Sequence, residues 1–138
     1  MVYLQKTYLI KMERIKQELE FPVRASPVIL YDYISNTSNL TQWFCDNLKA
    51  KDRENYLFIW DNEERRAKIE RRVRGKLIRW AWEDSPKGEY LELEVVKDDM
   101  TGDVLIKVTD FCDEDEADSN IDLWEADIDH LGSVVGAH

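Results

Sequence analysis

The pattern of apolar and polar positions predicts a strand, two short helices, a series of strands and a long last helix. Apolar and charged residues alternate from Arg14 to Phe21, with the two-residue period of a half-buried strand. Ser26 and Pro27 predict a helix start, because serine can cap a free backbone N–H and proline at the first helical position loses no hydrogen bond. A first helix, a polar break at 36–39 and a second short helix ending in two aromatics should carry the apolar residues Val28, Leu30, Tyr31, Ile34, Leu40, Trp43 and Phe44.

From residue 47 to 112 the period stays close to two, which predicts five or six strands joined by turns. A short strand is expected at 47–52 and another at 55–61. The charged segment 65–76 places Ala67, Ile69 and Val73 on one face, as in a half-solvated antiparallel strand, and Gly75 marks a bend. Turns near 85–88 and 101–103 should separate the remaining strands, which we expect at 76–84, 89–97 and 104–112.

The C-terminal segment predicts an amphipathic helix over about 119–135. Its apolar stripe has helical spacing and consists of Ile121, Trp124, Ile128, Leu131 and Val135, and Gly136 follows it. Acidic residues fill most of the run from Asp113 to Asp118, where they suit the positive end of the helix dipole. A cation site is the alternative, but the run lacks the glycine and ligand spacing of a calcium loop, so we predict no metal site.

This order of elements resembles the START-like (SRPBCC, helix-grip) superfamily. The segments that carry the resemblance are FPVRASPVILYDYISNTSNLTQWF (21–44), GKLIRWAWED (75–84) and TGDVLIKVTDFCDEDE (101–116), which leads into the Trp124 helix. Within the superfamily the chain is similar to the branch of the activator of the heat-shock chaperone ATPase and its bacterial homologues. It looks like the small START-like domains common in the Bacteroidetes.

The resemblance implies an α+β helix-grip fold, in which a curved antiparallel sheet wraps around the long C-terminal helix and a cavity lies between them. Members of the superfamily hold lipids, sterols, polyketides or plant hormones in that cavity, and others act by protein contact. The superfamily shares no catalytic residue, so none is carried over. We expect residues 12–138 to form the START-like domain and residues 1–11 to be an N-terminal extension outside it.

The candidate ligand contacts are apolar residues of the predicted strands and the last helix. Five tryptophans in 138 residues give rings for an aromatic-lined pocket, although core packing is the commoner role of a tryptophan. Trp80 and Trp82 should share a face of one strand, with Trp124 lying across it. The predicted cavity residues are Trp60, Ile78, Trp80, Trp82, Leu91, Leu93, Ile106, Trp124 and Ile128.

Polar candidates are fewer and have ordinary structural explanations. Asp110 would point inward if it shares a face with Ile106 and Val108, and outward if the face of Leu105 and Phe111 is buried; both orientations are open. His130 should face solvent. The arginines concentrated at 65–79 are expected to form cross-strand ion pairs with Glu83, Glu92 and Glu94. No nucleophile elbow occurs, so no catalytic residue and no cofactor is predicted.

The net charge indicates which classes of partner are unfavourable, and the cysteine content indicates the cellular compartment. The formal net charge of -10 disfavours nucleic acid and anionic membrane surfaces. No apolar run reaches the roughly 20 residues of a membrane span, and no secretory leader is evident. Cys45 and Cys112 read as small apolar fillers, which favours a reducing cytoplasm.

The leading hypothesis is a non-enzymatic cytoplasmic domain that binds a small apolar or aromatic ligand between sheet and last helix. The alternative is a protein-interaction module of the chaperone-activator type, and a cavity enzyme with cyclase-like proton transfer is the third. An enclosed apolar cavity would favour the first, a filled core with an exposed apolar patch the second, and convergent buried titratable groups the third. The ligand, the partner and the oligomeric state are not set by the sequence.

Overall fold

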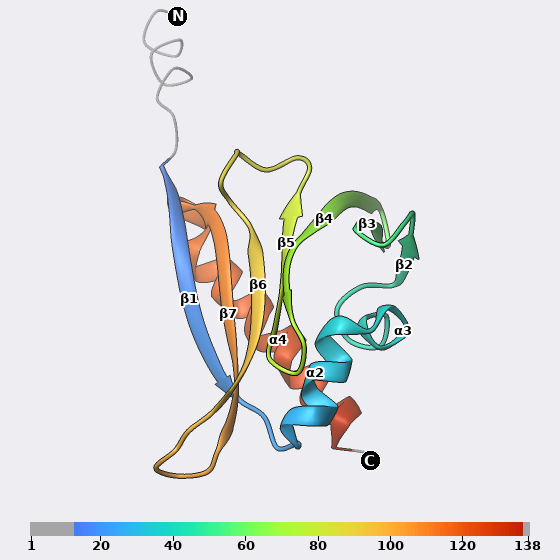
Figure 1. Cartoon of the computed structure of the whole chain (residues 1–138). Helices are drawn as coiled ribbons and strands as arrows, with labels where there is room; N and C mark the ends of the chain where they lie inside the picture. The colour runs from blue at the N-terminus through green and yellow to red at the C-terminus, as the bar shows by residue number, and fades with distance from the viewer. Residues whose placement is uncertain (1–12, 137–138) are drawn as a thin grey trace, which may run out of the picture.

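The computed structural model describes residues 13–136, which fold into a curved antiparallel sheet with a long helix across one face (Figure 1). The sheet contains β1 (Arg14–Pro22), β2 (Asn47–Ala50), β3 (Asn55–Trp60), β4 (Glu63–Val73), β5 (Leu77–Trp82), β6 (Leu91–Lys97) and β7 (Val104–Asp113). The helices are α2 (Pro27–Ser35), α3 (Thr37–Leu40), the 3-10 turn η1 (Glu114–Glu116) and α4 (Ala117–Val135). This is the α+β helix-grip arrangement predicted from the element order.

The strand order is β1-β7-β6-β5-β4-β3-β2, so that β2 to β7 form a meander of sequence neighbours. Only β1 departs from this order, because it pairs with β7 from Arg14 opposite Asp113 to Pro22 opposite Leu105. The first and last strands therefore lie side by side at one edge, and α4 follows β7 after the short η1 turn.

The two short helices begin at side-chain caps. The Ser26 hydroxyl accepts a hydrogen bond from the backbone N–H of Ile29 at 3.2 Å, and Pro27 follows, as expected. Asn36 ends α2 and caps α3 through its side-chain oxygen. The expected break at 36–39 is thus wrong beyond Asn36, since a single capping residue suffices to separate the helices. Trp43 and Phe44 lie in the turn after α3, not within it.

The last helix begins earlier than its apolar stripe indicated. α4 starts at Ala117 and is preceded by η1, whereas the sequence placed its start near 119. The polar residues at the start carry no periodic signal, so the stripe cannot locate the first turn. Trp124, Ile128, Leu131 and Val135 are buried, and Ile121 is half-buried.

A β-bulge corrects the predicted face of β4. The register with β5 shifts between Ile69 and Arg71, so that Ile69 lies opposite Trp80 but Val73 lies opposite Leu77. Because Leu77 and the core residue Ile78 point to opposite faces of β5, Val73 does not share the inner face with Ala67 and Ile69. The extra residue of the bulge reverses which positions of β4 face the core on its two sides.

The core lies between the concave face of the sheet, α2 and α4. Its fully buried side chains include Leu30 and Ile34 of α2, Phe58, Trp80, Leu93 and Ile106 of the sheet, and Leu131 of α4. In the described part of the chain, no helix is long and apolar enough to cross a membrane.

Candidate functional site

A continuous row of aromatic rings joins α4 to the sheet. Phe44 stacks on Trp124 with ring centroids 5.8 Å apart and packs edge-on against Trp60 at 5.5 Å. Trp60 lies 6.1 Å from Trp82 in turn. The indole N–H of Trp60 donates to the carbonyl of Phe44 at 2.8 Å, which fixes the ring by a hydrogen bond as well as by packing.

This row forms one wall of a hollow of about 200 Å³ that we call the aromatic groove. The apolar lining consists of Phe44, Trp60, Trp82, Leu91, Leu123 and Trp124. The polar lining consists of Arg65, Asp110, Asn120 and Asp127. A concave site with mainly apolar walls and a few polar groups is the usual form of a small-molecule site, although this volume lies below the typical range of about 300–1,000 Å³.

The structure divides the predicted cavity residues into two groups. Trp60, Trp82, Leu91 and Trp124 line the aromatic groove. Ile78, Trp80, Leu93, Ile106 and Ile128 belong to the packed core instead and do not line it. Every residue of the predicted set is buried except Trp60, which is half-buried. The open space is therefore at one end of the interface between sheet and helix, and the designation of the core group as ligand contacts stays a prediction.

Asp110 points inward, toward α4, which resolves the orientation that the sequence left open. Its Oδ2 accepts hydrogen bonds from the Trp124 indole N–H at 2.8 Å and from the Asn120 amide at 3.1 Å. Its Oδ1 accepts from the backbone N–H of Phe111 at 2.9 Å. The carboxylate thus anchors the first half of α4 to β7 at the edge of the groove.

Gln17 of β1 extends this hydrogen-bonded network to the start of the helix. Its amide donates to the carbonyl of Ala117 at 3.0 Å, and its oxygen accepts from Asn120 at 2.7 Å. Gln17 is buried, so both polar ends of its side chain need these partners. Sequence reasoning missed Gln17 and Asn120. The signal available was a glutamine at an inward position of an otherwise alternating strand.

Asp127 is the second carboxyl group of the groove. Burial raises its pKa to about 6, and the nearby His130 only partly offsets this. Asp127 lies one turn beyond Trp124 on the same face of α4, since residues three apart are neighbours on a helix surface. A carboxyl group with this pKa can exchange a proton near neutral pH. The sequence analysis did not select it, because burial is not visible in a helix rich in acids.

Arg65 closes the groove on the sheet side. Its guanidinium lies over the Trp82 ring, 4.1 Å from the centroid, and binds both carboxylate oxygens of Asp84, with distances of 2.7 and 3.1 Å. This pairing lowers the pKa of Asp84. The carboxylate of Asp84 therefore already balances the positive charge of Arg65 at the edge of the groove.

A second, mainly polar hollow of about 240 Å³ adjoins the groove and shares Arg65, Trp82, Asp110 and Asn120 with it. At its far end Arg14 binds Glu89 at 2.6 Å and Asp113 at 3.0 Å. These ion pairs hold β1, β7 and the β5–β6 loop together.

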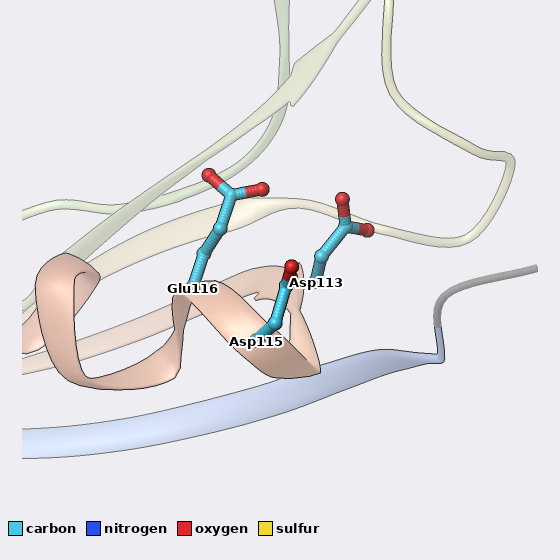
Figure 2. A group of neighbouring side chains, drawn as sticks. All are labelled: Asp113, Asp115 and Glu116. Carbon is cyan, nitrogen blue, oxygen red and sulfur yellow. The ribbon is translucent and has the colours of Figure 1, made fainter.

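The acidic run after β7 gathers Asp113, Asp115 and Glu116 on the same side of the η1 turn (Figure 2). Their ligand oxygens lie within 4.8 Å of one another. Asp113 is already engaged by Arg14, while Asp115 and Glu116 are exposed. Solvated acids near the N-terminal end of α4 are favourable for the helix dipole, which accounts for the run.

The other candidates lie where ordinary structural roles place them. His130 is exposed, as expected, and Cys45 and Cys112 are free and buried. Arg79 pairs with Glu92 at 3.0 Å, as predicted for a cross-strand pair. Glu94 pairs with Lys76 instead of an arginine. Glu83 is exposed and forms no ion pair among the described residues; its backbone N–H donates to the carbonyl of Arg66.

The chain belongs to the START-like superfamily, whose domain model matches residues 11–137. No curated protein gives a significant match. The family assignment agrees with the resemblance seen in the sequence.

Three solved structures illustrate the relationship. The solution structure of BfR322 from Bacteroides fragilis is 30% identical, with a TM-score of 0.57, and the match covers 88% of this chain and 90% of that one. The Aha1 dimer from Colwellia psychrerythraea is 13% identical, with a TM-score of 0.71, over 88% of this chain and 96% of the other. CalU16 from Micromonospora echinospora is 16% identical, with a TM-score of 0.61, over 88% and 73%. The last two likenesses show the fold alone.

Proposed function

We propose that this START-like domain is a non-enzymatic binding protein that takes a small apolar or aromatic ligand in the aromatic groove. The observation that carries the proposal is the row of Trp124, Phe44, Trp60 and Trp82 beside a hollow at the end of the sheet–helix interface. Aromatic walls provide a large rigid contact surface with little loss of side-chain entropy. The adjoining polar hollow offers room for a polar part of the same ligand.

The test is titration of the chain with fatty acids, sterols and flat aromatic compounds, monitored by tryptophan emission and by the thermal midpoint. A ligand in the groove should shift the emission, because three indoles line it, and should raise the midpoint by mass action. Trp82→Phe should weaken binding by roughly threefold or more, since an aromatic contact contributes about 0.5–1.5 kcal/mol.

Trp43→Phe is the matched control. It removes one indole from the core, where Trp43 donates to the carbonyl of Tyr33 at 2.9 Å, but Trp43 does not line the groove. Equal losses of affinity in both variants, or no response to any compound, would contradict binding in the groove.

A protein-contact role is the second candidate, and a separate surface favours it. Val28 on α2 is 80% exposed and lies on a hollow of about 550 Å³ with Ile29, Tyr31 and Gly75. A second copy of this chain is the partner we would test first, because the similar Aha1 structure is a dimer. Light scattering should then show a dimer that Val28→Glu dissociates; a monomer at all concentrations would contradict this.

We also keep the cytoplasm as the proposed location. Both cysteines are free and buried, and burial raises the pKa of the Cys45 thiol to about 12. Unpaired thiols are typical of proteins in a reducing compartment.

A further inference from the structure

The fixed charges at the aromatic groove do not balance. The charged residues that line it are Arg65, Asp110 and Asp127. Asp84, outside the lining, neutralises Arg65 through two hydrogen-bonded oxygens. Within residues 13–136, Asp110 accepts hydrogen bonds only from neutral donors, which are the Trp124 indole, the Asn120 amide and a backbone N–H. Negative charge therefore remains at the groove, in a chain whose formal net charge is also -10.

Asp127 adds to the negative charge at the groove, and among the described residues the charged group that acts on it is His130. Within residues 13–136 its carboxyl group accepts no hydrogen bond and forms no ion pair. It is half-buried against the groove, and its desolvation raises its pKa. A desolvated carboxylate without a partner is unfavourable, and a cation placed beside it would remove the cost.

The aromatic wall also suits a cation. The faces of tryptophan rings attract positive charge, and Arg65 over Trp82 is an instance built into this wall. Trp124 connects the two features, because its indole nitrogen contacts Asp110 and Asp127 follows it by one turn of α4.

We propose that the aromatic groove binds an organic cation, an amine with a flat or compact apolar body, whose ammonium group lies at Asp110 and Asp127 and whose body contacts the tryptophan wall. This inference rests on the proposed function and adds the chemical class of the ligand. The volume of about 200 Å³ fits a ligand of one or two rings better than a long lipid.

The experiment compares three compounds that share one ring system and differ in charge: 1-naphthylmethylamine, 1-naphthalenemethanol and 1-naphthoate. Dissociation constants are measured by calorimetry on the full chain at pH 7.5 and low ionic strength. The amine should bind at least about tenfold more tightly than the alcohol, because a hydrogen bond to a charged group is worth about 1.5–3 kcal/mol, and the naphthoate should bind most weakly.

Asp127→Asn should remove most of the preference for the amine over the alcohol. Asp129→Asn, an exposed position on the same helix, is the matched control and should leave both unchanged. The preference should also decline from pH 7.5 to 5 as Asp127 takes up a proton. The other charged groups that face Asp127 are Arg65 and Asp110 across the groove and His130 on α4, so the same pH series on Asp127→Asn supplies the background to subtract.

The possible outcomes distinguish failure of the cation inference from failure of the ligand-binding proposal. Equal binding of amine and alcohol would overturn the cation inference while the ligand-binding proposal stands. Tighter binding of the naphthoate would overturn it in favour of anion recognition through Arg65. If neither these three compounds nor the fatty acids and sterols of the first titration bind, both proposals are overturned.

Discussion

At the scale of single residues, Asp110 connects the groove to the stability of the fold. Asp110→Ala leaves the Trp124 indole N–H and the Asn120 amide without their acceptor. We expect the free energy of unfolding, measured in urea, to fall by about 1–3 kcal/mol, the cost of leaving a buried donor unsatisfied. Asp122→Ala, at an exposed position of α4, should change it by less than about 0.5 kcal/mol. Similar losses in the two variants would mean that the network contributes no stability.

Asp127 predicts a pH dependence of stability with a definite sign. The folded-state pKa of about 6 lies above the ordinary aspartate value of about 3.9, so the folded chain holds this proton more tightly than the unfolded chain. The resulting stabilisation is present at low pH and is lost as the pH rises from about 4 through 6. Asp127→Asn removes the charge, so its thermal midpoint should exceed that of the wild type at pH 8.

The difference between the two midpoints should shrink steadily as the pH falls from 7 to 4, because the wild-type carboxyl group becomes neutral. A difference independent of pH would place Asp127 in solvent.

Residue orientation was the least predictable property of the site. The alternation of β7 allowed Asp110 on either face, since apolar residues occupy both, and the choice follows from the burial of Ile106 and Val108 on the face where Asp110 meets Trp124 of α4. The partners Gln17 and Asn120 are 103 positions apart in the chain, and local patterns carry no information about such a contact.

At the scale of elements, α4 holds the concave face of the sheet closed. Trp124 is 6% exposed and stacks on Phe44, so Trp124→Ala removes a buried ring from the joint between helix and sheet. We expect a loss of about 3–5 kcal/mol in the free energy of unfolding. Leu123→Ala, one residue away but 65% exposed, should cost less than about 0.5 kcal/mol. A Trp124→Ala loss near zero would argue that α4 packs only loosely.

Elements with a strong period were predictable, and their irregular ends were not. The alternation in β1, β5 and β6 and the apolar stripe of α4 predicted those elements, because one buried face imposes the period. The β4 bulge between Ile69 and Arg71 and the η1 turn arise where charged residues carry no such constraint. The position of the groove could not be predicted for a similar reason. It lies at the end of the α4 interface and is lined by side chains of β4, β5 and β7, whose relative placement no local pattern records.

At the scale of the whole molecule, we predict that residues 1–11 are dispensable for folding. They lie outside the described residues, and the sheet pairing described here begins at Arg14, which Glu89 and Asp113 bind. Their deletion should lower the thermal midpoint by less than about 5 °C, a shift near 1 kcal/mol for a domain of this size. A larger decrease would make them part of the domain.

The excess of acidic residues predicts how salt acts on the fold. With a formal net charge of -10, self-repulsion favours the expanded chain, while exposed ion pairs such as Lys16–Glu18 contribute only about 0–1 kcal/mol each. Raising sodium chloride from about 10 to about 150 mM shortens the Debye length from about 30 to 8 Å. The salt should then weaken the repulsion among the acidic residues by more than it weakens the exposed ion pairs. The thermal midpoint at pH 7.5 should therefore rise, and the rise should vanish close to the isoelectric point, where the net charge is small. A midpoint that falls with salt would show that networks such as Arg14–Glu89–Asp113 outweigh the net charge.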